Sequence, residues 1–205
     1  MSVFAGCGDS PAEYNTIGSW LCAGTPILLS DGDRIRAAVA EVDRPVADTE
    51  PMCHYCGCRD MPLIKEFIAE HEAVYNLSGD IRRALESGDI DTARRDLVEI
   101  QRQLTEHWAG EEQGLFAVMR DDPDCTDYID ALEAEHREMT TDLSTADLTT
   151  PEGRQQVLAS LATLWPHIEK EEDGLFPMSL TTLSGEQWTA AIDAWERVHR
   201  RPVRR

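Results

Sequence analysis

Hydrophobic residues recur every three or four positions along most of this chain, which is the spacing that places them on one face of an α-helix. The pattern is present in four stretches, at about residues 62–88, 89–120, 126–148 and 151–178. Ile64 and Phe67, for example, share a face of the first stretch. We find no stretch that alternates between apolar and polar residues as a half-buried strand would. The pattern therefore predicts four long amphipathic helices.

Helix-breaking and helix-capping residues mark the ends of these stretches. Pro62 and Pro151 stand at the start of the first and fourth, where a missing amide hydrogen is tolerated. Gly88 follows the first stretch, and an Asp-Pro pair at 122–123 separates the second from the third. Pro166 lies inside the fourth stretch and predicts a kink in that helix.

Four helices joined by short loops favour an all-α fold, an up-down-up-down four-helix bundle whose core is formed by facing helices. We expect residues 52–180 to form this bundle. Residues 181–205 open with a capping-box sequence at 184–187, which predicts a short extra C-terminal helix followed by a basic tail. Residues 1–51 are rich in Gly, Pro, Asp and Ser and are expected to be an irregular N-terminal extension of unknown role.

The chain of 205 residues has a formal net charge of −20 and a pI near 4.5. Nucleic acids and anionic membrane surfaces repel such a protein, so we expect neither as a partner. The tail from Arg197 onward is the exception, because it contains five arginines. We expect this tail to lie in solvent or to fold back onto the acidic body rather than to bind a specific partner.

The sequence also bears on the compartment. No apolar run reaches the ~18 residues that a membrane span needs, and the N-terminus lacks the basic region of a secretory signal. The six cysteines then favour a reducing compartment, where clustered cysteines more often bind metal or take part in redox chemistry than form structural disulfides. We therefore expect a cytoplasmic protein.

The most informative sequence motif occurs twice. HWAGEEQGLF, which starts at His107, and HIEKEEDGLF, which starts at His167, are identical at six of ten positions. Residues four apart lie on the same face of a helix. His107 with Glu111, and His167 with Glu171, therefore each present an imidazole and a carboxylate in the same direction.

A second repeat precedes each copy, because one Ala-Glu-His triplet ends at His71 and another ends at His136. Each half of the repeat is thus predicted to be a helix hairpin that donates two histidines and one glutamate. The candidate metal ligands are His71, His107, Glu111, His136, His167 and Glu171. Glu112 and Glu172 lie one position further round the helix and are expected to face elsewhere, so that Glu112→Ala would keep both metal and stability.

Each of these histidines interrupts an apolar helix face. A single histidine in such a place is usually a hydrogen-bonded core residue, but here the arrangement occurs once in every predicted long helix. Two buried carboxylates without a cation would be costly to desolvate, and no lysine or arginine lies on these faces. Two divalent cations would satisfy all six groups together, which predicts a metal centre.

Imidazole and carboxylate ligands suit iron, manganese, zinc or copper, so ligand type alone does not select the metal. Six side chains, even with both glutamates shared, give each of two ions four contacts and leave coordination positions open. Two carboxylates also leave a divalent pair with excess positive charge, which favours an added anion or donation of electrons to dioxygen. Gly114 and Gly174, which follow the two glutamates, are expected to make room either for helix packing or for the added ligand.

The order His71, H-x-x-x-E at His107, His136 and H-x-x-x-E at His167 resembles the hemerythrin-like, or HHE, cation-binding domain. The resemblance covers about residues 52–178 and includes the opening MCHYCGCR, which is similar to the start of many bacterial HHE proteins. It implies a non-haem di-iron centre, that is, two Fe ions with an oxo or hydroxo bridge, both glutamates bridging and the histidines as terminal ligands. It also implies a small ligand such as O2, NO, peroxide or azide.

Two positions depart from the oxygen-carrying hemerythrins. Those proteins place a further histidine where this chain has Thr140, and their last carboxylate lies at the position of Glu172 rather than Glu171. The missing histidine implies a more open second iron, which shifts the expectation from reversible oxygen carriage towards peroxide, nitric oxide or redox sensing. Tyr75, one turn after His71, is expected either to approach this open side or to be a plain core tyrosine.

A cluster of cysteines precedes the first predicted helix, at Cys53, Cys56 and Cys58. A cysteine pair beside a helix N-terminus has lowered thiol pKa values, which suits thiolate chemistry. The cluster is cramped for a tetrahedral zinc ion, so a fourth ligand would come from elsewhere in the chain, from Cys7, Cys22 or Cys125. A second thiol or zinc site and a group of reduced cysteines without function are both consistent with this segment.

Three functions agree with these observations. The first is a di-iron protein that binds or senses O2, NO or peroxide at an open iron position. The second is a di-iron enzyme that acts on peroxide or an organic substrate. The third is a protein that binds and releases iron or zinc without redox chemistry. The sequence favours the first.

Overall fold

The computed structural model describes residues 57–204, so the predicted extension at 1–51 lies outside the described residues. Within this range the chain is all-helical and contains no strand. The elements in order are η1 (Cys58–Asp60), α2 (Pro62–Ser87), α3 (Ile90–Gly110), η2 (Glu111–Leu115), α4 (Phe116–Met119), α5 (Pro123–Thr145), α6 (Pro151–Lys170), η3 (Glu171–Leu175), α7 (Phe176–Thr182) and α8 (Gly185–His199). No helix in this range is long and apolar enough to cross a membrane.

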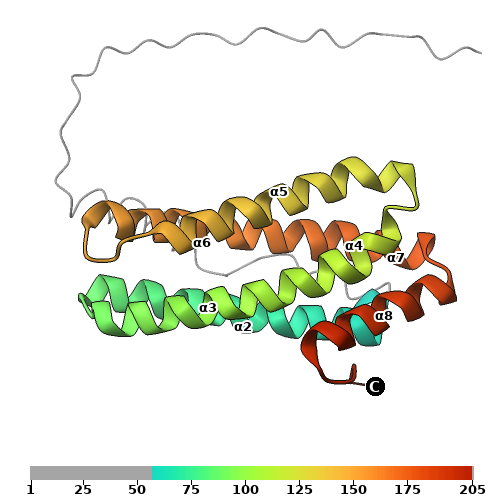
Figure 1. Cartoon of the computed structure of the whole chain (residues 1–205), viewed down its shortest axis with the longest axis horizontal. Helices are drawn as coiled ribbons and strands as arrows, with labels where there is room; N and C mark the ends of the chain where they lie inside the picture. The colour runs from blue at the N-terminus through green and yellow to red at the C-terminus, as the bar shows by residue number, and fades with distance from the viewer. Residues whose placement is uncertain (1–56, 205) are drawn as a thin grey trace, which may run out of the picture.

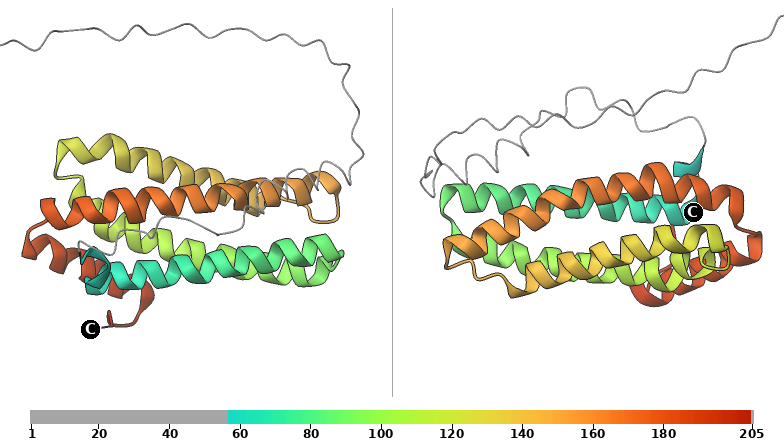
Figure 2. Two further views of the ribbon diagram at one scale, coloured as in Figure 1. Left: turned by 180° about the vertical axis from the view of Figure 1, so that it is seen from behind. Right: turned by 90° about the horizontal axis from the view of Figure 1, so that it is seen from above.

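The long helices pack side by side as a helical bundle. Figure 1 shows α2 beside α3 and α5 beside α6, and the reverse view in Figure 2 shows the same pairing. The shorter helix α8 lies at one end of the bundle and packs against α3 and η2. The bundle predicted from the apolar periodicity is therefore present as an all-helical assembly.

The helix boundaries follow the local capping chemistry. Gly88 ends α2 with φ 77°, a left-handed conformation that glycine adopts without strain. Asp89 begins α3 by accepting a hydrogen bond from the Thr92 amide at 3.1 Å. Pro62 lies in the first turn of α2, and Ser184 caps α8 with the predicted capping box. These ends agree with those expected from the sequence to within a residue or two.

Helices α3 and α6 both change their hydrogen-bonding pattern at the repeated motif. Helix α6 continues through Pro166 to Lys170, and only then does the π-helical turn η3 begin at Glu171. The turn η2 begins in the same way at Glu111. In each turn the amide of the following phenylalanine bonds to the carbonyl of that glutamate, five positions earlier. The apolar periodicity did not predict these π-turns, which in proteins often occur at functional sites.

Two apolar clusters fill the bundle and are separated by a polar layer. One cluster includes Phe67, Phe116 and Trp195, and the other includes Val74 and Leu104. In α2 and α5 the chain passes from the first cluster through one buried histidine to the second, and in α3 and α6 it passes through a buried histidine in the opposite order. The packing therefore places the polar layer inside the bundle, with apolar contacts on both sides.

Candidate metal centre

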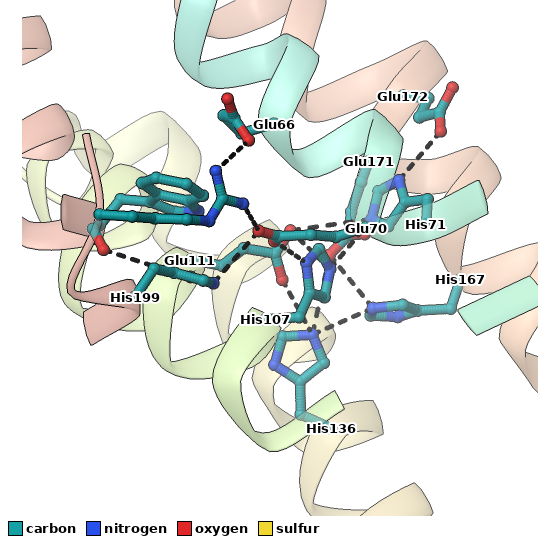
Figure 3. Close-up of polar contacts among 12 residues, drawn as sticks. Glu66, Glu70, His71, His107, Glu111, His136, His167, Glu171, Glu172 and His199 are labelled. Carbon is teal, nitrogen blue, oxygen red and sulfur yellow. Dashed lines mark hydrogen bonds and ion pairs between the residues drawn. The ribbon is translucent and has the colours of Figure 1, made fainter. Parts of the chain in front are cut away.

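The structure brings the six predicted ligands together in this polar layer. Each long helix contributes one histidine, and the two π-turns contribute the glutamates. All four histidines are 2% exposed and both glutamates are 0% exposed. Figure 3 shows their imidazole and carboxylate groups converging from different helices, at His71, His107, Glu111, His136, His167 and Glu171.

The inner nitrogens of the histidines face one another in pairs. The Nε2 atoms of His71 and His107 are 3.0 Å apart, as are those of His136 and His167. Glu171 lies between the pairs, with one carboxylate oxygen 3.1 Å from His71 Nε2 and the other 3.1 Å from His167 Nε2. The arrangement places nitrogen and oxygen donors at a spacing that a bound ion could bridge.

The donor atoms form two groups that share Glu171. The first half of the centre is defined by His71 and His107, and it includes Glu111 and Glu171. The second half is defined by His136 and His167, and it includes Glu171. Within each group the donor atoms lie within 4.8 Å of one another. Glu111 also lies between the halves, with one oxygen 3.4 Å from His107 Nε2 and the other 3.7 Å from His136 Nε2.

Every outer nitrogen of the four histidines meets a carboxylate at 2.9 Å. The pairs are His71 with Glu172, His107 with Glu70, His136 with Glu112, and His167 with Glu135. Such partners fix the orientation and tautomer of histidines that bind metals. Glu112 and Glu172 were expected to face elsewhere. They do lie outside the donor cluster, but each contacts the outer nitrogen of one of its histidines. This contact argues against the expectation that Glu112→Ala would keep the metal, which stays untested.

This outer contact determines which nitrogen is available for a metal. A neutral imidazole that donates its Nδ1 hydrogen to a carboxylate retains a lone pair on Nε2. The Nε2 atoms of each pair are 3.0 Å apart, so without metal a proton must lie between them, and a cation could take its place and bind both. The histidines therefore fit a bound metal ion.

The two central glutamates fit a cation for a second reason. Both oxygens of Glu111 are buried without a hydrogen-bond partner in the described part of the chain, and those of Glu171 are buried with histidine Nε2 atoms as their nearest possible donors, 3.1 Å away. Burial raises the pKa of Glu111 well above its usual range, and the facing Glu171 carboxylate raises it further. Burial alone would raise the pKa of Glu171 too, but His167 and the other nearby histidines lower it well below its usual range. Buried oxygens without donors are expensive unless a cation binds them.

The charges and burial around the first half determine which of its two histidines carries a proton when no metal is bound. Burial alone would lower the pKa of His71, but the Glu171 and Glu172 carboxylates outweigh it and raise the pKa to about 9. Burial lowers the pKa of His107 to about 4, because the Glu70 carboxylate only partly offsets it. Without metal, His71 therefore holds a proton at neutral pH and His107 does not, and an incoming cation would displace that proton.

A cavity of about 150 Å³ adjoins the first half of the centre. Its lining is largely aromatic and aliphatic and includes one metal-ligand candidate, with the residues Arg59, Ile68, His71, Glu72, Tyr75, Trp165, Ile168 and Glu172. Tyr75 is 39% exposed and its ring centroid lies 5.0 Å from that of Trp165, so Tyr75 is not a core tyrosine. The cavity is large enough for a few small molecules and reaches the outer side of one ligand histidine.

Thr140 does not face the donor cluster. The residue is exposed, and its hydroxyl donates to the His136 carbonyl at 2.7 Å. Thr140 therefore leaves no open position on the donor cluster by itself.

The motif glycines serve helix packing. A Cβ atom on Gly114 would lie 3.0 Å from the backbone carbonyl oxygen of Ala191 in α8, and one on Gly174 would lie 2.5 Å from the Tyr128 hydroxyl oxygen. Of the two roles expected for these glycines, the structure supports close packing.

The predicted cysteine site lies almost wholly outside the described residues. Cys53 and Cys56 precede them, and for Cys58 only the backbone is described, in η1. Cys125, a candidate for the fourth zinc ligand, is buried in the apolar core, and its thiol lies 3.7 Å from the Met178 sulfur. This position gives Cys125 a packing role.

Glu70 and Glu135, which contact the outer nitrogens of His107 and His167, were not among the residues predicted from the sequence. A signal for them was present, because each is the glutamate of an Ala-Glu-His triplet and is repeated with it. The spacing showed which residues share a helix face, but not that these glutamates reach a histidine on the neighbouring helix.

Comparison with protein families gives one match. The family described as Hemerythrin HHE cation binding domain matches residues 63–179, which include all six buried candidates. The comparisons with curated proteins and with solved structures found no match.

Proposed function

The chain belongs to the hemerythrin HHE cation-binding domain family, and from this premise we propose that its bundle binds two iron ions and uses them to bind a small ligand. The proposal assigns the ions to the ligands His71, His107, Glu111, His136, His167 and Glu171. It includes the up-down-up-down order of the four long helices, which their short connections favour. The observation that supports it most is the convergence of four imidazole Nε2 atoms on the buried carboxylates of Glu111 and Glu171.

The donor set favours an exchangeable ligand at the metal. A divalent pair with two carboxylate ligands retains positive charge, which favours an added anion or a ligand that accepts electron density. Iron, when bound, would supply a redox-active Lewis acid for O2, NO, peroxide or azide. We place the more open position in the second half, because the carboxylates behind its histidines are 39% and 32% exposed, against 17% and 3% in the first half.

The remaining residues have supporting roles in this proposal. The four outer carboxylates hold the imidazoles with Nε2 directed inward. The two apolar clusters exclude bulk water on either side of the centre. The cavity beside Tyr75 and Trp165 offers a small molecule a route to the outer side of the first half.

Metal analysis combined with an optical spectrum tests the proposal. We expect two iron ions per chain and a near-ultraviolet absorption band that shifts when azide is added. A colourless protein that contains only zinc would overturn both the iron centre and the ligand. Steady evolution of oxygen from added peroxide would instead assign the centre to an enzyme.

A further inference from the structure

The C-terminal segment, residues 199–204, folds back onto helix α2. Arg201 Nη1 and Arg204 Nε lie 2.7 Å and 2.8 Å from the carboxylate oxygens of Glu66, and the Arg204 backbone amide donates to the same carboxylate at 2.8 Å. Val203 is buried, and its amide donates to Glu196 of α8 at 2.9 Å. Ion pairs, backbone hydrogen bonds and apolar packing thus hold the segment in place.

Glu66, the residue to which this segment is attached, is a buried residue of the bundle. Its side chain is 0% exposed, and a buried carboxylate is tolerated only when cations and hydrogen-bond donors compensate it. Arg201 and Arg204 supply this compensation, although both follow the last helix of the chain. The basic tail is therefore bound to the acidic body, as one of the two sequence expectations proposed.

Glu70, one turn further along α2, connects the segment to the candidate centre. One of its oxygens lies 3.1 Å from His199 Nε2 and 3.5 Å from Arg201 Nη2. Its other oxygen is 2.9 Å from His107 Nδ1. Figure 3 shows Glu70 between His199 and His107. One carboxylate thus separates the C-terminal segment from a ligand of the first half.

Helix α8 is packed tightly enough to fix His199. The His199 ring stacks on Trp195 with centroids 4.0 Å apart, and the Arg201 guanidinium lies 4.4 Å from the Trp195 ring centroid. A Cβ atom on Gly110 would lie 2.8 Å from the His199 ring. The close approach of α8 occurs at the turn of α3 that precedes Glu111, so α8 and the ligand-bearing turn are held at a fixed distance.

The second half of the centre has a looser outer layer. In the first half, the Glu70 side chain is 17% exposed and that of Glu172 is 3% exposed, with Arg59 2.5 Å from Glu172. In the second half, Glu112 is 39% exposed and Glu135 is 32% exposed. Water therefore competes with the outer hydrogen bonds of the second half much more than with those of the first.

We propose that His199 and Arg201 are positioning residues that hold His107 through Glu70, so that the ion of the first half is retained more tightly than the ion of the second. This inference rests on the proposed metal centre. Loss of an outer partner of a ligand histidine lowers metal affinity by roughly 10–100-fold. The C-terminal segment then makes one ion long-lived and leaves the other exchangeable, although the ligand motif itself is duplicated.

Release of iron to a ferrous-iron chelator, followed in the full chain, tests the proposal. The wild-type protein is expected to release its two ions in a fast and a slow phase. His199→Phe keeps a ring on Trp195 but removes the nitrogen that contacts Glu70. Arg201→Ala removes the second contact with Glu70, together with the Arg201 contacts to Glu66 and Trp195. Each variant is expected to speed the slow phase about tenfold and to leave the fast phase unchanged. Arg201→Lys should restore part of the slow phase.

Arg197→Ala is the matched control. Arg197 lies in the same helix as His199, and the contact described for its side chain is from Nε to the Asp193 carbonyl one turn earlier in α8, at 3.2 Å. This control is expected to keep both phases. Mössbauer spectra of the iron-loaded His199→Phe protein should show a change in one of the two iron signals, which a general loss of stability would not produce.

The outcomes separate the inference from the metal centre on which it rests. Iron at two per chain that leaves in a single phase, or a His199→Phe variant that speeds both phases equally, would overturn the positioning role and leave the metal centre intact. A protein that binds no iron would overturn both.

Discussion

Glu111 and Glu112 are adjacent in the sequence, yet their carboxylates lie in opposite surroundings. Glu111 is fully buried, and neither of its oxygens has a hydrogen-bond donor among the described residues. Glu112 is partly exposed and holds the outer nitrogen of His136. One residue is thus suited to bind a cation directly, and the next is suited to orient a ligand.

Replacing Glu111 should have opposite effects on the loaded and the metal-free protein. Glu111→Leu removes a proposed metal ligand and should lower the iron content below two per chain. In the metal-free protein it removes a buried carboxyl group without hydrogen-bond donors, and should raise the free energy of unfolding by on the order of 1–3 kcal/mol. Urea unfolding of wild type and Glu111→Leu, each with and without iron, measures these free energies. A metal-free Glu111→Leu protein that is less stable than the metal-free wild type would contradict the prediction.

Replacing Glu112 should weaken metal binding without abolishing it. Glu112→Ala leaves the outer nitrogen of His136 without its carboxylate, which should lower the affinity for one ion by about tenfold. Competition with a chelator of known affinity measures the change. Glu106→Ala is the control, because Glu106 is an exposed residue on α3 that pairs with Arg102. Equal affinities in the Glu112 and Glu106 variants would refute the role of Glu112.

At the scale of elements, the candidate centre depends on the two π-turns and on α8. The π-turns place Glu111 and Glu171 in the polar layer at the ends of α3 and α6. Helix α8 packs on the first of these turns and is continued by the segment that binds α2. Helix α8, which lies outside the two duplicated hairpins, therefore helps to hold the candidate metal ligands in place.

Gly114→Ala tests the packing of α8 on η2. The added methyl group would lie 3.0 Å from the Ala191 carbonyl oxygen, so one of the two backbones must shift. Overpacking of this kind typically lowers stability by about 1–3 kcal/mol. Gly185→Ala, where nothing lies within 4 Å of the added atom, is the control. Urea unfolding should show a lower midpoint for Gly114→Ala only, and unchanged midpoints in both would contradict the packing role.

The attachment of the C-terminal segment should depend on pH through Glu66. Burial alone would raise the Glu66 pKa, but hydrogen bonds from Arg204 and Arg201 outweigh it and lower the pKa below its usual value of 4.5. A carboxyl group with a lowered pKa in the folded state stabilises the protein above its unfolded pKa and loses this contribution as the pH falls through the folded value. The stabilisation by the Glu66 carboxylate is therefore complete above pH 4.5 and declines as the pH falls below that value.

Glu66→Gln measures this contribution in the metal-free protein. The stability difference between wild type and variant should be largest near neutral pH and should shrink as the pH falls below 4.5. Thermal unfolding across the acidic range provides the data. A difference that stays constant with pH would show that the Glu66 charge does not hold the segment.

At the scale of the whole molecule, the duplication of the sequence explains the candidate ligands and the carboxylates behind them, but not the groups that contact those carboxylates. The two hairpins repeat their histidines, their central glutamates and the carboxylates behind the histidines. The groups that contact those carboxylates differ, with His199 and Arg201 on Glu70 but Lys170 on Glu135. The two halves of the centre therefore resemble each other in these repeated residues and differ in the groups that contact the outer carboxylates.

Removal of the metal should destabilise the molecule as a whole. Ions that bind the folded state and not the unfolded one add stability by mass action. Here they would also neutralise buried carboxylates at the centre of the bundle. We expect the melting temperature to fall by roughly 5–10 °C when iron is removed by a chelator and to recover when iron is restored. Calorimetry measures this, and identical melting temperatures would contradict a buried metal site.

Much of the fold and of the candidate site followed from local sequence. The helix ends at Gly88, Asp89 and Ser184 depend on residues within a few positions, and the sequence predicted them. The convergence of the six ligands followed from the duplication and the apolar periodicity. The π-turns were missed, because the position at which a helix widens depends on what packs against it, and Tyr75 proved to be exposed rather than part of the core.

The sequence by itself determined which side chains share a helix face, because a residue and the one four positions later are related by helix geometry alone. It thereby selected His107 with Glu111 and His167 with Glu171. Only the tertiary structure decided which carboxylate meets which outer nitrogen and which half the C-terminal segment supports. Glu172 reaches His71 across 101 positions, and Arg204 reaches Glu66 across 138. Contacts between residues so far apart depend on how whole helices pack, and no local pattern in the sequence specifies them.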